Sequence, residues 1–340
     1  MTDAILVSAD GGNGFFKVRS GAVPGLSFPS VLSVMNETTE GFSLSLNGGA
    51  DDQIICFDGK LYAIGETVRF KGLTPVTITH RSRIATEFYR VLFAAALAAT
   101  VRRSATCNVV LSLPPAAYWD KDTMKAILSG RYEVEVMTDG KMRRRVFEVP
   151  IEGMRVIPEG VGTVCCLALN ERGAERDSSL ASRQVGLVDI GTYTTDFVLL
   201  NGLRIVRSGT DSLPHGLHDI HEKLRTFASR KGVDLDYYGM DEILRQGYFL
   251  KGRDRIHFKQ EAEAWASELT QAISAMIRSK WNGGDNAEDI IVAGGGEPQC
   301  NMLLAQEFSQ VRSIAETGIA PWLTNCEGAY RYGLLKSGRG

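Results

Sequence analysis

Residues 185–202 constrain the fold of this chain more than any other stretch. An apolar run ends in the carboxylate of Asp189, a turn rich in glycine and threonine follows, and a second apolar run leads to Asn201 and Gly202. Short apolar runs separated by such residues predict strands joined by tight turns, and Asn-Gly is a strong hairpin signal. We therefore expect two strands joined by a tight turn, with residues 203–207 returning as a third.

The turn that follows Asp189 has the composition of a phosphate-binding loop. Gly191 lets the backbone come close to a ligand because it has no side chain. Threonine hydroxyls and backbone N–H groups of the same turn are able to face phosphate oxygens. The sequence predicts that the chemistry of this half of the chain lies here.

The same order of features opens the chain. Residues 4–10 form a short apolar run that ends in an aspartate, residues 11–14 read Gly-Gly-Asn-Gly, and residues 15–19 suit a return strand. When Asp10 is placed on Asp189, Gly12 falls on Gly191 and Lys17 falls on Asp196. The identity between the copies is weak, but the shared order predicts a duplicated domain with one site between the copies.

Composition excludes several classes of protein. A chain of 340 residues with a net charge of −2 has no general electrostatic grip on nucleic acid, although a local basic patch is possible. The longest apolar run, residues 91–101, is shorter than the roughly 20 residues that span a bilayer. The six cysteines are scattered without a Cys-x-x-Cys pair, which is typical of buried thiols in a reducing cytoplasm. We expect a cytoplasmic protein with no membrane association.

The predicted elements divide the chain into two α/β domains with mixed sheets flanked by helices. Residues 1–170 form the first domain, with a small inserted subdomain over about residues 36–80. A C-terminal helix within residues 321–340 completes this domain. Residues 183–320 form the second domain, with a small insertion over about residues 232–257.

Apolar periodicity, capping residues and turn signals give the individual elements. Helices are expected over residues 82–103, 119–129, 161–169, 216–231, 258–281, 300–309 and 327–335. Short strands are expected over residues 42–46, 54–57 and 60–64, and a hairpin over residues 131–149 with its turn at Asp139 and Gly140.

Acidic or glycine residues follow the ends of buried strands in four loops, residues 10–14, 158–160, 189–195 and 294–297. In α/β folds ligands bind beyond the ends of the strands. Each loop alone also has a plain structural reading: a simple turn after Asp10, a helix cap at Glu159, a glycine loop selected for its shape. Four such loops in order, two of them repeated, are harder to explain in that way.

The chain resembles the actin-like ATPases, and most closely the bacterial plasmid-segregating actins (the ParM/StbA group). The resemblance rests on motifs that span nearly the whole chain in the order of the family: Asp10 to Lys17 for the first phosphate motif, Pro158-Glu159-Gly160 for the first connecting motif, Asp189 to Asp196 for the second phosphate motif, Ile290 to Gly296 for the adenosine motif, and Glu327-Gly328-Ala329-Tyr330 for the second connecting helix. Departures from the pattern are Asn13, Phe15 and Phe16 in the first turn and Tyr193 in the second.

The resemblance implies duplicated actin-like (ribonuclease H-like) domains with a nucleotide cleft between them, and ATP and Mg²⁺ as cofactors. It implies that Asp10 and Asp189 hold Mg²⁺ through water, that Glu159 positions the attacking water, and that Asp189 also belongs to the catalytic set. The nucleotide contacts that it implies are the backbone of Gly12, Asn13, Gly14, Gly191, Thr192, Tyr193 and Thr194 for the phosphates, the Lys17 side chain, and Gly294, Gly295 and Gly296 for adenine and ribose.

Two side-chain groups keep alternatives open. Asp196 could pair with Lys17 across the cleft in a structural role instead of contacting the ligand. His215, His218 and His221 recur at spacings of three on an expected helix. A metal site is possible there, and a solvated helix face is the simpler interpretation.

The function that the resemblance implies is an ATPase that polymerises into filaments and segregates plasmid or other DNA through a DNA-binding adaptor protein. One alternative is a small-molecule kinase on the same fold. Such an enzyme needs a general base beside a substrate pocket, and Glu159 suits water better. The other alternative is a nucleotide-dependent adaptor that does not polymerise. A membrane adaptor would need an amphipathic terminal helix, and neither end of the sequence provides one.

Overall fold

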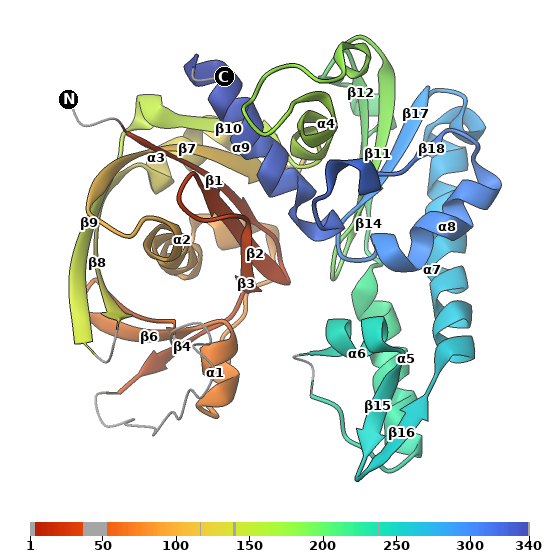
Figure 1. The fold of residues 1–340 in the computed structure, drawn as a ribbon, viewed down its shortest axis with the longest axis horizontal. Helices are drawn as coiled ribbons and strands as arrows, with labels where there is room; N and C mark the ends of the chain where they lie inside the picture. Colours follow the sequence, from red (N-terminus) through yellow and green to blue (C-terminus); the bar gives the residue numbers. More distant parts are fainter. Residues whose placement is uncertain (1–3, 37–52, 116, 139–140, 237–238, 339–340) are drawn as a thin grey trace. The chain divides into compact units, whose positions relative to one another are not determined.

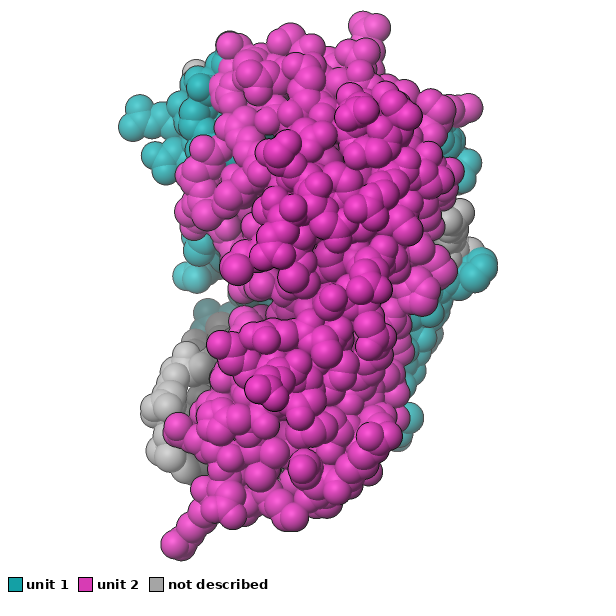
Figure 2. Space-filling view, turned by 90° about the vertical axis from the view of Figure 1, so that its right-hand side faces the viewer, with its two compact units in different colours: residues 1–176, 325–340 teal, residues 177–324 magenta. Residues whose placement is uncertain are grey.

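A computed structural model gives the fold of residues 4–36, 53–115, 117–138, 141–236 and 239–338. The chain divides into two compact units, residues 1–176 with 325–340, and residues 177–324 (Figure 2). The expected strand at residues 42–46 and the turn at Asp139 and Gly140 lie outside the described residues.

The first unit contains a mixed sheet with the order β3-β2-β1-β7-β10. Its strands are β1 (Ile5–Gly11), β2 (Phe15–Ser20), β3 (Leu26–Pro29), β7 (Ala105–Leu113) and β10 (Met154–Pro158). β1 runs antiparallel to β2 and parallel to β7, and β10 is parallel to β7. The carboxyl ends of β1, β7 and β10 therefore lie along one edge of the sheet.

The sheet continues from β7 through a second group of strands. These are β9 (Lys141–Val149), β8 (Gly130–Thr138), β5 (Ile54–Phe57), β6 (Lys60–Ile64) and β4 (Leu32–Met35) in that order. Together the strands curve around helix α2 (Glu87–Thr100) (Figure 1). A helix enclosed in this way must be apolar on most of its surface, and nearly all of α2 from Phe88 to Thr100 is buried.

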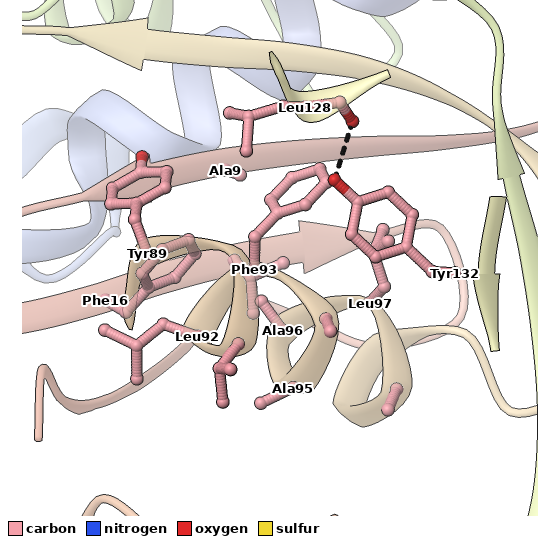
Figure 3. Packing of buried hydrophobic residues seen from close by; sticks show 14 of the residues in the cluster. Ala9, Phe16, Tyr89, Leu92, Phe93, Ala95, Ala96, Leu97, Leu128 and Tyr132 are labelled. Carbon is pink, nitrogen blue, oxygen red and sulfur yellow. Dashed lines mark hydrogen bonds between the residues drawn. The ribbon is translucent and has the colours of Figure 1, made fainter. Parts of the chain in front are cut away.

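The α2 helix is shorter than the expected helix over residues 82–103. A 3₁₀ helix, Arg81–Ala85, comes first, and Thr86 is extended with φ −99° and ψ 159°, so the α-helix begins only at Glu87. Within the core, Phe93 packs edge-on against Tyr132, whose hydroxyl donates to the Leu128 carbonyl at 2.8 Å (Figure 3).

The remaining helices of the first unit are α1 (Glu66–Phe70), α3 (Lys121–Leu128), α4 (Val161–Ala168) and α9 (Thr324–Ser337). The α9 helix packs on α4 with almost no space between the backbones. A Cβ atom on Gly328 would lie 1.7 Å from the Gly162 carbonyl oxygen, and one on Gly162 would lie 2.1 Å from the Asn325 carbonyl oxygen. Glycine at both positions allows this approach.

A buried ionic network also holds α9 in place. The Glu327 carboxylate accepts hydrogen bonds from Arg19 of β2 and from Arg331 Nε, the latter at 2.8 Å. Arg331 also donates to the carbonyl oxygens of Cys166 at 2.8 Å and Leu169 at 2.7 Å. The network therefore ties α9 to both β2 and α4.

Removing the charge of Glu327 should destabilise the first unit strongly. In Glu327→Gln the Arg19 and Arg331 guanidinium groups would lose their shared counter-ion, and breaking a buried ion pair costs about 3–5 kcal/mol. Denaturant unfolding measures the loss. Glu171→Gln is the matched control because Glu171 is exposed, and equal stability of the two variants would contradict the prediction.

The second unit repeats the strand order of the first. Its sheet runs β14-β12-β11-β17-β18, with β13 also paired to β12. The strands are β11 (Gln184–Ile190), β12 (Thr195–Asn201), β13 (Arg204–Ile205), β14 (Asp211–Leu213), β17 (Asp289–Ala293) and β18 (Val311–Arg312). β11 is antiparallel to β12 and parallel to β17, as β1 is to β2 and β7.

Helices α5 (Leu217–Arg230), α7 (Lys259–Lys280) and α8 (Glu297–Glu307) flank this sheet. The α8 helix starts three residues before the expected position because Gly296 is its N-cap and Pro298 lies in the first turn. Proline is tolerated there since its missing N–H has no partner in the helix.

The insertion of the second unit forms α6 (Met240–Gln246) and the hairpin of β15 (Tyr248–Lys251) and β16 (Asp254–His257). Phe249 and Phe258 pack on Leu224 and Ala228 of α5. The expectation of a solvated histidine face is wrong for His221, which is 4% exposed and bonds through Nε2 to Asp241 Oδ1 at 2.9 Å. This bond joins α5 to α6.

Across the described part of the chain, none of the helices combines the length and the apolar character that a bilayer crossing requires.

Candidate functional site

The β1–β2 hairpin carries the first group of predicted site residues. Asp10 lies near the end of β1, is 2% exposed, and is the cross-strand partner of Lys17. The Lys17 Nζ atom lies 3.3 Å from Asp10 Oδ2. The turn of Gly12, Asn13 and Gly14 follows directly, so a carboxylate, an ammonium group and a glycine turn are brought together at one edge of the sheet.

The carbonyl oxygens of this turn are held by the first unit itself. The Ser30 hydroxyl donates to the Gly12 carbonyl at 2.7 Å, and the Ser30 N–H donates to the Gly14 carbonyl at 2.8 Å. Arg83 donates to the Gly12 carbonyl at 3.1 Å and to the Gly11 carbonyl. The turn is therefore a fixed loop.

Glu159 follows β10 at the same edge of the sheet. Its N–H donates to the Leu113 carbonyl at 2.7 Å, which extends the pairing of β10 with β7. The N-cap of α4 is Gly160, with φ +90°, and its N–H donates to Asn325 Oδ1 at 3.0 Å. The alternative in which Glu159 caps this helix is therefore wrong, because Glu159 lies one residue before the cap position. The Glu159 side chain is half-buried.

In the second unit the corresponding turn is closed by a hydrogen bond from the Gly191 N–H to the Thr194 carbonyl at 2.9 Å. The first residues of α5 bind the turn from behind: Leu217 N–H donates to the Gly191 carbonyl at 3.0 Å, and His218 N–H donates to the Thr192 carbonyl at 2.7 Å. As in the first unit, carbonyl oxygens of the turn face the protein.

Tyr193 is the residue of this turn that departs from the family pattern. Its ring lies 5.0 Å from the ring of His218, and burial raises the pKa of its phenol. Tyr193 therefore packs on α5. In the same turn, the Thr194 hydroxyl lies 3.5 Å from the carboxylate of Asp196, which is the cross-strand partner of Asp189.

The glycine run of residues 294–296 packs against the end of β11. Gly294 has φ +86°, and a Cβ atom there would lie 2.4 Å from Asp189 Oδ1. A Cβ atom on Gly296 would lie 2.3 Å from a side-chain carbon of Ile190, and the Gly296 N–H donates to the Ile190 carbonyl at 3.0 Å. The structure thus brings the adenosine motif beside the second aspartate.

Sequence reasoning missed Ser30 and Arg83, which hold carbonyl oxygens at the first turn, and Asn325, which accepts from the Gly160 N–H after Glu159. None of them lies in a motif, and each reaches its partner from a distant part of the chain. The only local signal is an arginine at position 83 next to the buried Ile84, and such a position more often belongs to the surface.

No group of three or more metal-ligating side chains occurs within the described ranges. The expected Mg²⁺ site does not require one, because Mg²⁺ usually keeps several waters and binds one or two carboxylates. Asp10 and Asp189 supply donors of the right kind, and only a glycine at position 294 leaves space beside Asp189 Oδ1. Each unit thus supplies one carboxylate of the kind that suits the ion.

Comparisons with known proteins identify the family. A model of the N-terminal domain of actin-like proteins matches residues 8–162. A model of the C-terminal domain of the MreB-like archaeal actin homologues matches residues 187–306. The chain belongs to the actin-like superfamily. A search of curated protein sequences found no match to this actin-like protein.

Solved structures share the fold over their whole length. An archaeal actin homologue superimposes with a TM-score of 0.79 at 20% identity, covering 98% of this chain and 99% of that one. The same homologue in complex with ADP gives 0.73 at 19% identity, covering 98% and 99%. A 15-stranded ParM filament from Clostridium botulinum gives 0.73 at 19% identity, again covering 98% and 99%. The predicted class of duplicated actin-like domains with mixed sheets and flanking helices is confirmed.

Proposed function

We propose that this actin-like protein binds ATP with Mg²⁺, hydrolyses it, and assembles into filaments of its own copies. The shared register of the two hairpins carries the proposal. In each hairpin an aspartate near the end of the first strand precedes a glycine turn and pairs across the strands, Asp10 with Lys17 and Asp189 with Asp196. The ADP complex of the archaeal homologue supports a nucleotide as the ligand.

The residue roles follow from the chemistry of phosphoryl transfer, which needs charge neutralisation and an aligned nucleophile more than covalent help. Lys17 would add positive charge near the phosphates. The residues that would contact the nucleotide through the backbone are Gly12, Asn13, Gly14, Gly191, Thr192, Tyr193 and Thr194 for the phosphates, and Gly294, Gly295 and Gly296 for the nucleoside.

Asp10 and Asp189 would hold Mg²⁺ through its water molecules. When bound, the ion supplies positive charge that offsets the charge of the phosphate oxygens. Glu159 would orient and polarise the attacking water, and its place directly after β10 at the same edge as Asp10 supports this role.

Replacing Asp189 with alanine should reduce Mg²⁺-dependent ATP turnover by at least about tenfold, because a metal ion contributes several kcal/mol of charge stabilisation. Phosphate release measured across a Mg²⁺ titration tests this. Asp285→Ala is the matched control, since Asp285 is exposed in the same unit. Normal turnover of Asp189→Ala at low Mg²⁺ would remove the residue from the metal site.

The proposed biological role is segregation of plasmid or other DNA in the cytoplasm. The chain would contact DNA through an adaptor protein, because a net charge of −2 gives no general attraction to phosphates. The ParM filament among the structural neighbours supports assembly into a homopolymer as the working form.

Light scattering and sedimentation in ATP and Mg²⁺ separate the alternatives. Filaments that appear with ATP and disappear as phosphate is released support the proposal. A soluble protein whose turnover requires an added metabolite would indicate a small-molecule kinase. A soluble protein that binds nucleotide without turnover would indicate a nucleotide-dependent adaptor.

A further inference from the structure

A buried arginine lies beneath the first glycine turn. Arg83 belongs to the 3₁₀ helix Arg81–Ala85 and is 3% exposed. Its guanidinium donates to the carbonyl oxygens of Gly11 and of Gly12, the latter at 3.1 Å. Arginine is seldom buried to this extent unless its charge is compensated. The position therefore calls for an explanation beyond packing.

The hydrogen bonds of Arg83 determine the direction in which the turn presents its N–H groups. All described peptide bonds are trans, and in a trans peptide the C=O and the following N–H point in opposite directions. Holding the Gly11 carbonyl toward Arg83 turns the Gly12 N–H away from it, and holding the Gly12 carbonyl does the same for Asn13. The guanidinium has a planar fork, so it can hold both carbonyls at once.

The surroundings of Arg83 keep it in place. Its guanidinium lies 5.7 Å from the centre of the Tyr89 ring, and Tyr89 packs against Phe16 of β2 with ring centres 5.6 Å apart (Figure 3). A Cβ atom on Gly11 would lie 2.3 Å from the Tyr89 hydroxyl. The strand end and the tyrosine are thus packed with no room for a side chain at position 11, and the arginine lies beside the tyrosine ring.

The charge of Arg83 is also available to an anion at the turn. Burial lowers the pKa of Arg83, while the nearby Tyr89, Glu159 and Asp10 oppose this effect. A desolvated cation is costly in a protein interior. Because its field is weakly screened there, an anion placed on the far side of the turn would offset part of that cost.

We propose that Arg83 is a positioning residue for anion binding at the first glycine turn: it fixes the two peptide planes between residues 11 and 13 so that the N–H groups of Gly12 and Asn13 face a nucleotide phosphate, and it adds weakly screened positive charge behind them. The inference rests on the proposed nucleotide binding and adds to it a side chain that supports the phosphate-binding turn from within the first unit.

Arg83→Met tests the inference through the affinity for ADP, measured by equilibrium titration with a fluorescent ADP analogue. Loss of a charged donor to two buried carbonyls should weaken binding on the order of 10- to 100-fold. Arg90→Met is the matched control. Arg90 lies over the rings of Phe57 and Tyr132 in the same unit, whereas the side chains that donate to the carbonyl oxygens of the turn are Ser30 and Arg83. It should lower thermal stability and leave ADP affinity unchanged.

Arg83→Lys and Ser30→Ala test the same role through ADP affinity if Arg83→Met folds poorly. The lysine keeps the charge but reaches one carbonyl at a time, so it should restore part of the affinity. Ser30 and Arg83 hold the same Gly12 carbonyl, so the effects of Ser30→Ala and Arg83→Lys on ADP affinity should be non-additive.

The outcomes separate the inference from the function on which it rests. Weaker binding by the Arg83 variants, with Arg90→Met binding normally, supports the inference. Folded Arg83→Met and Arg83→Lys variants with normal ADP affinity would overturn it and leave the proposed function standing. Failure of the wild-type protein to bind ADP would overturn both.

Discussion

Glu159→Ala is expected to slow phosphate release from ATP by roughly 100-fold or more, the usual contribution of a positioned acid–base group. Nucleotide affinity and assembly should remain, because the glycine turn and the pair of Asp10 with Lys17 are unchanged. Filaments of this variant should therefore persist longer in ATP. Phosphate release and light scattering recorded on the same sample measure both quantities.

The Glu159→Ala substitution leaves the backbone hydrogen bond of this residue intact. The link to β7 runs through the Glu159 N–H to the Leu113 carbonyl, which alanine retains. Glu152→Ala is the matched control, since that carboxylate is exposed in the same unit. Unchanged turnover in Glu159→Ala would exclude Glu159 from the role of orienting water.

Gly328→Ala is expected to destabilise the first unit by at least about 3 kcal/mol, at the upper end of overpacking effects. The added methyl group would lie 1.7 Å from the Gly162 carbonyl oxygen and 2.5 Å from the Cys166 nitrogen. Both atoms belong to the backbone of α4, so the two helices would have to separate. Denaturant unfolding of the purified variant measures the loss.

Gly333→Ala is the control for that measurement. It lies on the same helix and gains the same helix propensity of about 1 kcal/mol. Its nearest neighbours are side-chain carbons of Leu6 and Val110, at 2.8 and 3.0 Å, which can move. The prediction fails if Gly328→Ala is as stable as Gly333→Ala.

The hairpins of the fold could be predicted from the sequence because their signals are local. The alignment that placed Lys17 on Asp196 is the register that the strands adopt, with Asp10 and Asp189 as the respective partners. Alternating or apolar runs with glycine turns specify such pairs without reference to the rest of the chain.

Features that depend on tertiary contacts could not be predicted from the sequence. The strand Asp211–Leu213 is short and ends before a proline, so its pairing with β12 gave no periodic signal. The sequence predicts a solvated face at His221 because its hydrogen-bond partner, Asp241, lies in another helix. Arg83 was missed for the same reason, since its hydrogen-bond partners are main-chain oxygens far away in sequence.

We expect one polyphosphate ligand to drive self-assembly of this chain. The most direct test is sedimentation of the purified protein with Mg²⁺ and no nucleotide, with ADP, with ATP, and with a non-hydrolysable ATP analogue. We expect a filamentous pellet with ATP and with the analogue, and we expect the pellet to disappear over time only with ATP. Protein that stays in the supernatant under all four conditions would contradict this expectation.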